Sequence, residues 1–396
     1  MDSLNKSIIV HYHHSFCFVE NKFFISRNIG IWLEALSKKF KRVIYLSVST
    51  NKKIKDQVHK ITSENISFVS LGNKSEGLPT LSGKVNAIKF CIKYTSKEDF
   101  LLIRGFTPLQ NIVWFFSKPK INKAFLLVRE LKSIRQISLN PLELLKFFLN
   151  KYREFTFNLI LNSKGIFITN SYENIYEINL KKNIELGFVN TNILSEKEIP
   201  KFKYKLIKNH NEVDLLFVGR VTPLKGIYDL FKAILILREE KFINQKINLN
   251  IVGSYNQEIK KDLLKITSKI SSSSLNIKFL GYLNSTNSLN KMYQNADLFI
   301  LPSHSEGFPR CIWEAASNST PMLLTNVGGI PHLLKNNHHA LLVKPHSPHE
   351  IAKKIQYFFE NKDTADKLAK NAYDLLKNYN IESSIKDLIK NLEEKV

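Results

Sequence analysis

The second half of the chain alternates short, largely apolar runs with segments of helical periodicity. Strands of this kind are buried on both faces, which is typical of a parallel sheet covered by helices on both sides. The runs that fit are "DLLFVGR", "INLNIVGS", "IKFLGYL", "DLFILPS", "PMLLTN" and "ALLVKP". They predict a doubly wound α/β domain over residues 213–380.

The first half shows the same kind of pattern less regularly, in runs such as "SIIVHYH", "RVIYLSV" and "GIFITNS". It predicts a Rossmann-like, acceptor-binding domain over 1–195. The charged, aperiodic stretch 196–212 contains a proline and is expected to be the linker. A helix over 381–396 ends the chain, and packing back on the N-terminal domain is one arrangement open to it. The fold class is therefore α/β, with two doubly wound domains facing a cleft.

Cysteine content and hydropathy limit the cellular compartment in which the protein is expected. The widely spaced Cys17, Cys91 and Cys311 argue against a disulfide framework and against a thiolate metal site. The first residues hold too short an apolar stretch for a signal peptide. No run reaches the ~18 apolar residues that span a bilayer. We therefore expect a cytoplasmic protein.

The net charge of +23 favours anionic partners, although the richness in Lys, Asn and Ile offers compositional drift as an alternative source of the excess. The segment 140–164 mixes Leu and Phe with Lys and Arg. It is expected either to lie on an anionic membrane surface or to cover the core of the first domain. Basic patches interleaved with aromatic residues, or a known nucleic-acid motif, are not found, so nucleic acid is not an expected partner.

The loop "FVGRVTPLKG" joins a strand to a helix and carries Gly219, Arg220, Lys225 and Gly226. Glycines allow a close backbone approach, and two cations beside a helix N-terminus suit a diphosphate. The alternative is a sharp turn with solvated cations. A second glycine pair, in "TNVGGIPHLL", is either another loop of close approach or an ordinary turn.

The segment "HSEGFPRCIWEAAS" places Glu306 in a loop and Glu314 on the helix that follows. Because the Gly-Phe-Pro break bends the chain, both carboxylates can face one cleft. One alternative is a helix capping box formed by Ser303 and Glu306. Another is an acid/base carboxylate pair for glycoside hydrolysis, which leaves the role of Arg220 and Lys225 unexplained.

Several polar side chains end strands of the first domain. His11, His13 and His14 end the first strand, and strand alternation predicts that His11 and His13 share a face. We expect His13 and His14 to contact the sugar or the acceptor, and Arg104 to meet an anionic acceptor. Structural roles are the alternative for all of them. No acidic or Cys partner lies at ligand spacing, so no metal site is expected.

In their order, "FVGR…KG", "IVGS", "IKFLGYL", "ADLFILPSHSEGFPRCIWEAA", "P…VGGIP" and "LLVKP" resemble the retaining nucleotide-sugar glycosyltransferases of family 4, which have the GT-B fold. The resemblance covers about 213–350 and extends weakly through the N-terminal half. The two glutamates then match the family's E-x7-E motif.

The resemblance implies a role for each site residue. Glu306 contacts the donor sugar near its anomeric centre, and Glu314 holds the ribose hydroxyls. Arg220 and Lys225 hold the diphosphate and stabilise its charge as it leaves. The other donor-binding residues are Gly219, the backbone amides of Gly307 and Phe308, and Leu280 and Tyr282 near the base.

The activity implied is metal-independent transfer of a sugar from a nucleoside-diphosphate sugar, with UDP favoured over GDP. The acceptor is a glycan or a polyprenyl-linked glycan in the synthesis of capsule, O-antigen or lipopolysaccharide. The resemblance places the protein in the cytoplasm, peripherally on the inner face of the cytoplasmic membrane. No cofactor is expected besides the donor itself, and the absence of any Asp-x-Asp triplet argues against a metal-held donor.

Some positions depart from the family pattern. Ser319 and Ala340 stand where glycine is usual, His332 stands where Glu is usual, and "HYHHSFCFVENKFF" replaces the N-terminal Gly-Gly loop. These departures keep an alternative open, a catalytically weak nucleotide-sugar-binding scaffold of a glycan assembly complex.

Overall fold

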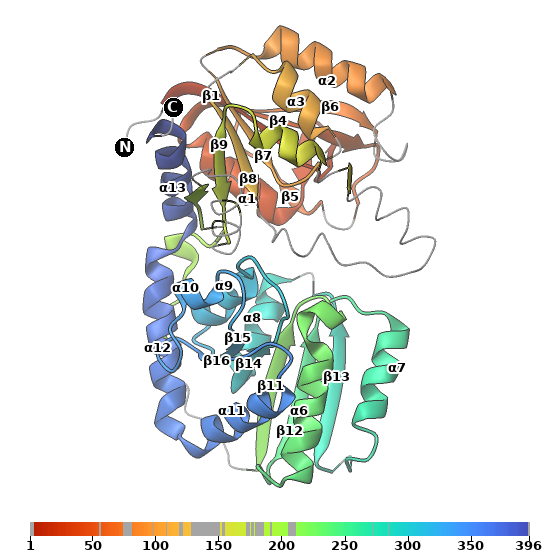
Figure 1. Ribbon diagram of the computed structural model, residues 1–396, viewed down its shortest axis with the longest axis vertical. Coiled ribbons are helices and arrows are strands. Elements are labelled where there is room, and N and C mark those ends of the chain that lie inside the picture. The colour runs from red at the N-terminus through yellow and green to blue at the C-terminus, as the bar shows by residue number, and fades with distance from the viewer. Residues whose placement is uncertain are drawn as a thin grey trace. The chain divides into compact units, whose positions relative to one another are not determined.

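The structure, a computed structural model, describes residues 4–54, 57–73, 81–97, 99–107, 109–118, 122–127, 151–152, 155–171, 175, 178, 186–190, 192–204, 211–271, 273–283 and 285–394. The chain divides into two compact units (Figure 1). Unit 1 comprises Met1–Ile193 and Ile381–Val396, and unit 2 comprises Leu194–Asn380. Each unit is built on a sheet of its own.

The sheet of unit 2 is parallel throughout and has the strand order β13-β12-β11-β14-β15-β16. Its strands are β11 (Glu212–Val218), β12 (Lys246–Val252), β13 (Leu275–Gly281), β14 (Leu298–Leu301), β15 (Met322–Thr325) and β16 (Leu341–Val343). All six coincide with the apolar runs of the sequence. The order reverses direction between β11 and β14, and ligands of such sheets bind at that point, beyond the carboxyl ends of the strands.

The helices of unit 2 cover both faces of this sheet (Figure 1). They are α6 (Ile227–Glu239), α7 (Gln257–Ile266), α8 (Thr286–Asn295), α9 (Arg310–Ser317), α10 (Ile330–Leu333), α11 (Pro348–Glu360) and α12 (Lys362–Asn378). α6 contacts α7 and α11, while α9 contacts α8 and α12. Apolar side chains of the strands and helices form one continuous core, which fixes the loops at the carboxyl ends of the strands.

The sheet of unit 1 follows the order β10-β9-β8-β7-β1-β4-β2-β3-β5, with β6 paired to β4. Its strands are β1 (Leu4–His11), β2 (Phe16–Val19), β3 (Lys22–Ile25), β4 (Phe40–Thr50), β5 (His59–Lys60), β6 (Ile66–Asn73), β7 (Phe100–Arg104), β8 (Lys123–Leu127), β9 (Ile166–Thr169) and β10 (Leu186–Phe188). Strands β1, β4 and β6 to β10 pair in parallel. Here the order reverses between β1 and β7.

The segment that replaces the family's Gly-Gly loop forms a hairpin that sequence reasoning missed. β2 and β3 pair antiparallel, with Val19 opposite Lys22. The two residues between them, Glu20 and Asn21, have φ values of 51° and 56°. Such left-handed values at both positions are those of the tight turn that matches strand twist.

Residues 155–161 of unit 1 are helical, and its other described helices include α1 (Arg27–Ser37), α2 (Leu81–Tyr94), α3 (Gln110–Phe116) and α13 (Ile381–Glu394). The last of these packs against α1, β9 and β10. Its apolar side chains, among them Ile385, Leu388 and Leu392, belong to the same core as Ile8 and Val10 of β1. Ser384 donates a hydrogen bond to the carbonyl of Asn190, and Asn391 donates one to that of Phe188. The final helix is therefore an integral part of unit 1.

The segment 140–164, for which membrane contact or a core-covering role was expected, lies mostly outside the described residues. Within the described part of the chain, none of the helices combines the length and the apolar character that crossing a bilayer requires.

Candidate functional site

The loop after β11 carries Gly219, Arg220 and Lys225 to the carboxyl end of the unit 2 sheet. It continues through a 3-10 turn, Pro223–Lys225, into α6. Gly226, between the two, has a φ of 66°. A Cβ atom there would lie 1.7 Å from the carbonyl oxygen of Pro302 in the loop after β14. Only glycine permits both the backbone conformation and this approach, so the two loops at the reversal point are packed backbone to backbone.

An ion pair joins these two loops. The Lys225 ammonium donates to the Oε1 atom of Glu306, and the two side chains are 19% and 10% exposed. The Ser303 hydroxyl donates to the same carboxylate oxygen at 2.7 Å, and the carbonyl of Ser303 accepts from Thr325 at 2.5 Å. The partly buried carboxylate is therefore compensated by a cation and held by a hydroxyl, as a buried charge requires.

The capping-box alternative for Ser303 and Glu306 is wrong. α9 begins at Arg310 and has Pro309 at its N-cap, so Ser303 lies well outside the helix. The contact between Ser303 and Glu306 joins two side chains in a loop. Glu306 is thereby left in the loop, as the sequence predicted, and Glu314 lies on α9.

Glu314 has a fixed partner on the next helix. The Tyr293 hydroxyl of α8 donates to its Oε2 atom at 3.0 Å. Burial, with the Glu314 carboxylate as a further cause, raises the pKa of Tyr293 well above its usual value, so the phenol stays protonated and donates. Sequence reasoning did not identify Tyr293. This bond orients one carboxylate oxygen of Glu314.

The other predicted donor-binding residues differ in how far they are exposed to solvent. Arg220 is exposed at the end of β11. Phe308 is buried and stacks on Trp313 with ring centroids 4.9 Å apart, so its ring belongs to the core. The carbonyl of Gly307 accepts from the amide of Gly329 at 2.6 Å, which joins the "VGGIP" loop to the "SEGF" loop.

Leu280 and Tyr282 flank Gly281 at the end of β13. They are 37% and 67% exposed, and Gly281 has a φ of 68°. The exposed apolar surface of these two side chains is of the kind on which a planar base can stack. Their contact with a base stays a prediction.

At the reversal point of unit 1, His11 is buried within the sheet. Its Nδ1 lies 2.8 Å from the carbonyl oxygen of Leu46 and its Nε2 lies 2.7 Å from the Thr107 hydroxyl. Because a carbonyl only accepts, Nδ1 carries the proton and Nε2 accepts from Thr107. Burial lowers the pKa of His11 to about 4, so the ring is neutral and structural.

The expectation that His11 and His13 share a strand face is wrong, because β1 ends at His11. Beyond it, Tyr12, His13 and His14 form a cluster of rings with centroids 4.3 to 4.9 Å apart. Arg104, at the end of β7, lies over the Tyr12 ring at 5.3 Å and over the Trp32 ring at 4.6 Å. His13, His14 and Arg104 thus meet around Tyr12, and their contact with an acceptor stays a prediction.

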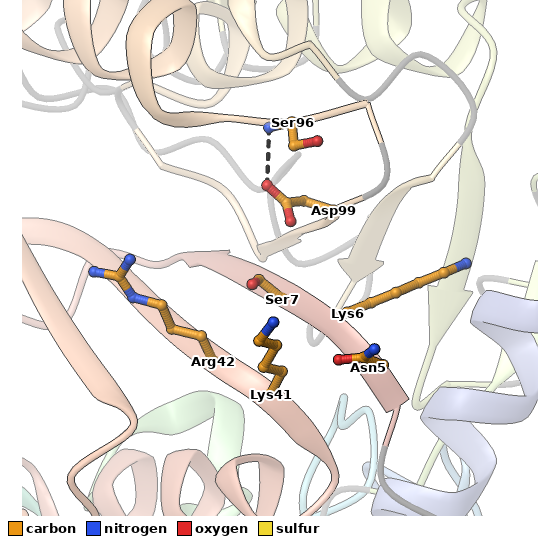
Figure 2. Close-up of a pocket in the computed structure, with 7 residues that line it drawn as sticks. All are labelled: Asn5, Lys6, Ser7, Lys41, Arg42, Ser96 and Asp99. Atoms are coloured by element: carbon orange, nitrogen blue, oxygen red, sulfur yellow. Dashed lines mark hydrogen bonds between the residues drawn. The ribbon is translucent and has the colours of Figure 1, made fainter.

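Unit 1 also has a shallow hollow of about 330 Å³ at the opposite end of its sheet (Figure 2). Its lining includes Lys6 at the start of β1 and Lys41 and Arg42 at the start of β4. The Arg42 guanidinium donates to Ser67. Ligands of parallel sheets bind beyond the carboxyl ends, so this hollow at the amino ends is separate from the predicted acceptor region.

One group of three metal-ligating side chains occurs in the described ranges of unit 2: Asp229, His304 and His346. Sequence reasoning missed it because the three residues lie on separate segments of the chain and share no ligand spacing. It lies beside the donor loops, since the amide of His304 donates to the carbonyl of Leu224 at 2.9 Å.

Comparison with known proteins agrees with this geometry. Residues 198–375 match the family Glycosyl transferases group 1. An uncharacterized glycosyltransferase of Methanocaldococcus jannaschii is 31% identical over 159 residues, which are 40% of this chain and 39% of that protein.

A second relative is the N,N'-diacetylbacillosaminyl-diphospho-undecaprenol alpha-1,3-N-acetylgalactosaminyltransferase of Campylobacter jejuni. It is 26% identical over 219 residues, 55% of this chain and 52% of that protein. The chain thus matches about half of the length of these curated relatives, or less.

The fold extends over the whole chain. The Anabaena protein HepE, solved in complex with UDP and glucose, superposes with a TM-score of 0.71 at 15% identity, over 98% of this chain and 99% of its own. The GT-B class of fold, with two Rossmann-like units, is thereby confirmed.

Proposed function

We propose that this protein transfers a glycosyl group from a nucleoside-diphosphate sugar to a glycan or polyprenyl-linked acceptor. The observation that carries the proposal is the Lys225–Glu306 pair at the reversal point of the unit 2 sheet. A diphosphate entering there meets the Lys225 ammonium and the exposed Arg220 guanidinium. Glu306 is then placed beside the sugar, and Glu314 beside the ribose.

The pairing of Lys225 with Glu306 suits a site that alternates between two states. Without donor, the cation and the carboxylate compensate each other in a partly buried place. When a diphosphate binds, its charge competes for the ammonium, and the carboxylate becomes available to the positive charge that develops on the sugar. Donors and charges fixed in advance of the reaction are those that stabilise a transition state.

The finer proposal is a retaining transfer from UDP-sugar, without a metal ion. The bond from the anomeric carbon to the diphosphate oxygen breaks, and a bond to the acceptor oxygen forms on the same face. The acceptor's proton passes to the leaving phosphate oxygen, and Arg220 and Lys225 stabilise the negative charge of the diphosphate. Support for UDP comes from HepE, solved with UDP and glucose. Support for a polyprenyl-linked acceptor comes from the printed activity of the Campylobacter jejuni relative.

The setting proposed is surface polysaccharide synthesis at the inner face of the cytoplasmic membrane. The net charge of +23 supports attraction to anionic lipid at that surface. Binding to vesicles that contain anionic phospholipid, compared with neutral vesicles, measures this part of the proposal separately.

Two variants test the activity. Glu306→Gln keeps the size of the side chain but removes its charge, so we expect turnover to fall roughly 10²- to 10³-fold while donor still binds. Arg220→Ala removes a charged hydrogen-bond donor, so we expect the donor Kd to rise roughly 10- to 100-fold. Glu239→Gln and Lys261→Ala, both exposed on unit 2 helices, are matched controls. Transfer at the wild-type rate in both site variants would refute the proposal.

A screen of nucleotide sugars by thermal unfolding identifies the donor. A ligand that binds only the folded chain raises Tm by an amount set by its concentration relative to Kd. We expect UDP-sugars to raise Tm in the wild type and less in Arg220→Ala. A donor that binds without any measurable transfer points to the scaffold alternative.

A further inference from the structure

Three side chains from separate segments of unit 2 converge next to the donor loops. Asp229 lies in the first turn of α6, His304 follows β14, and His346 lies between β16 and α11. One ligand atom of each lies within 4.8 Å of those of the other two. The His304 Nε2 atom is 2.7 Å from the Asp229 Oδ2 atom. The rings of His304 and His346 have centroids 3.7 Å apart.

The donor set is that of a first-row transition metal. Two imidazole nitrogens and one carboxylate oxygen are ligands that Zn²⁺ accepts, and a fourth position is left for water. Calcium and magnesium prefer oxygen ligands and fit this set poorly. Asp229 is buried, His304 is partly buried and His346 is exposed, so an ion has both an anchored carboxylate and a path from solvent.

The distances permit an ion after small movements of side chains. Tetrahedral ligands ~2.0 Å from Zn²⁺ lie roughly 3.3 Å apart. The Asp229–His304 pair at 2.7 Å must open slightly, and the more distant ligand atom, within 4.8 Å, must move closer. We take these changes to come from rotation of the exposed His346 ring and of His304.

An ordinary hydrogen-bonded Asp–His pair explains only part of this arrangement. It accounts for Asp229 and His304 but not for the third residue. His346 has a φ of 59°, a left-handed conformation that costs a non-glycine residue of order 1 kcal/mol. The chain nevertheless places an imidazole there, against the ring of His304. Binding of one metal ion would account for the placement of all three side chains.

We propose that Asp229, His304 and His346 bind a divalent transition-metal ion of the zinc class. The ion ties together the start of α6, the loop after β14 and the loop before α11. His304 is two residues from Glu306, and its amide donates to the carbonyl of Leu224, the neighbour of Lys225. In this proposal the site positions the Lys225–Glu306 pair, a role that goes beyond the proposed transfer activity.

Metal binding by the full-length chain tests the proposal. The protein is prepared without a polyhistidine tag, stripped with EDTA, dialysed and titrated with Zn²⁺ by calorimetry. Co²⁺ serves as a second probe, because its visible absorption reports nitrogen and oxygen coordination. We expect one equivalent of tight Zn²⁺ binding, a Co²⁺ spectrum and a rise in Tm, since the ion binds the folded state.

The exposed His346 is the residue to change, since His346→Ala leaves the core and the donor residues in place. We expect its affinity for Zn²⁺ to fall at least 10-fold, with loss of the Co²⁺ spectrum and of the Tm rise. His349→Ala, an exposed histidine three residues further along, is the control and keeps wild-type binding. Equal Zn²⁺ affinity in wild type and His346→Ala, or no binding of one equivalent to the wild type, would overturn the proposal. Donor binding measured without metal separates this outcome from a failure of the proposed transfer.

Discussion

The reversal points of the two sheets have the same topology but different chemistry. In each unit the first long parallel strand, β1 or β11, lies between a strand that follows it closely in sequence and one that comes later. In unit 2 the loops at this point are joined by an ammonium and a carboxylate, Lys225 and Glu306. In unit 1 they carry rings and a guanidinium, with Arg104 over Tyr12 and Trp32.

The difference indicates two kinds of ligand. A pair of opposite charges suits a ligand that carries negative charge and that leaves the site as an anion after reaction. Aromatic rings with one cation suit a ligand that offers apolar ring faces together with polar or anionic groups, as sugars do. The sheet topology determines where a ligand binds, and the loop residues determine which ligand it is. Effects on donor and effects on acceptor should therefore separate between the two units.

Lys225→Met should have the largest effect. It removes the ammonium that we propose meets the diphosphate and leaves the partly buried Glu306 carboxylate without its cation, so we expect kcat/KM to fall roughly 10²- to 10³-fold. Lys225→Arg should recover part of this loss because the charge is kept. Initial rates at varied donor concentration measure both variants. An unchanged kcat/KM in Lys225→Met would show that the Lys225–Glu306 pair does not contribute to donor binding or turnover.

Acidification should destabilise unit 1 through His11. The unfolded imidazole takes up a proton near pH 6.5, whereas the buried ring resists protonation down to about pH 4. The unfolded state therefore binds more protons, and this contribution to stability is present above pH 6.5 and is lost as pH falls. The loss approaches ~3 kcal/mol of unfolding free energy.

Urea unfolding of the wild type and of His11→Asn at several pH values isolates this contribution. Carboxylates titrate in both proteins, so only the difference between them reports on His11. A difference that stays constant between pH 7 and pH 4 would contradict the assignment of His11 as a neutral, structural residue.

Arg104→Lys should affect the acceptor and spare the donor. Lysine keeps the charge but loses the planar group that stacks on Trp32 and Tyr12, so we expect the acceptor KM to rise about 10-fold with the donor KM unchanged. Arg42→Lys, at the opposite end of the same sheet, is the matched control. A rise in the donor KM instead would show that unit 1 does not have the role assigned to it.

The smallest effect should come from the hairpin turn in unit 1. Asn21 has a left-handed backbone that glycine adopts without strain, so Asn21→Gly should add about 0.5 kcal/mol to the free energy of unfolding. Urea unfolding measures this change, and transfer rates should stay at the wild-type level. A change in the acceptor KM would show that the hairpin takes part in binding.

Unit 2 was predictable because its strands are apolar runs separated by helices of clear periodicity. The bend between Glu306 and Glu314 followed from the Gly-Phe-Pro break, and the reason for the family's glycine at position 319 is visible in the φ of 57° that Ser319 adopts. The loop pairing was not predictable, since the ion pair joins residues far apart in the sequence. For the same reason, residue spacing could not reveal the group formed by Asp229, His304 and His346.

Unit 1 was less predictable. Its parallel strands were expected, but the β2–β3 hairpin was missed because its turn is formed by Glu20 and Asn21 rather than by a glycine pair. The prediction applied the alternating faces of a strand to residues beyond His11, but β1 ends at His11. His11 was grouped with His13 and His14, although burial and two hydrogen bonds give it a separate, structural role.

The return of α13 to unit 1 has a consequence for how the chain folds during synthesis. Unit 2 is contiguous in sequence, so its core is complete once residue 380 has left the ribosome. Most of unit 1 precedes unit 2 in the sequence, yet Ile385, Leu388 and Leu392 of its core are made only after unit 2. The usual N-terminal-first order of domain folding is therefore inverted at the final step. A ribosome paused before residue 381 should display a folded unit 2 and an apolar face on unit 1 that is still open to a chaperone.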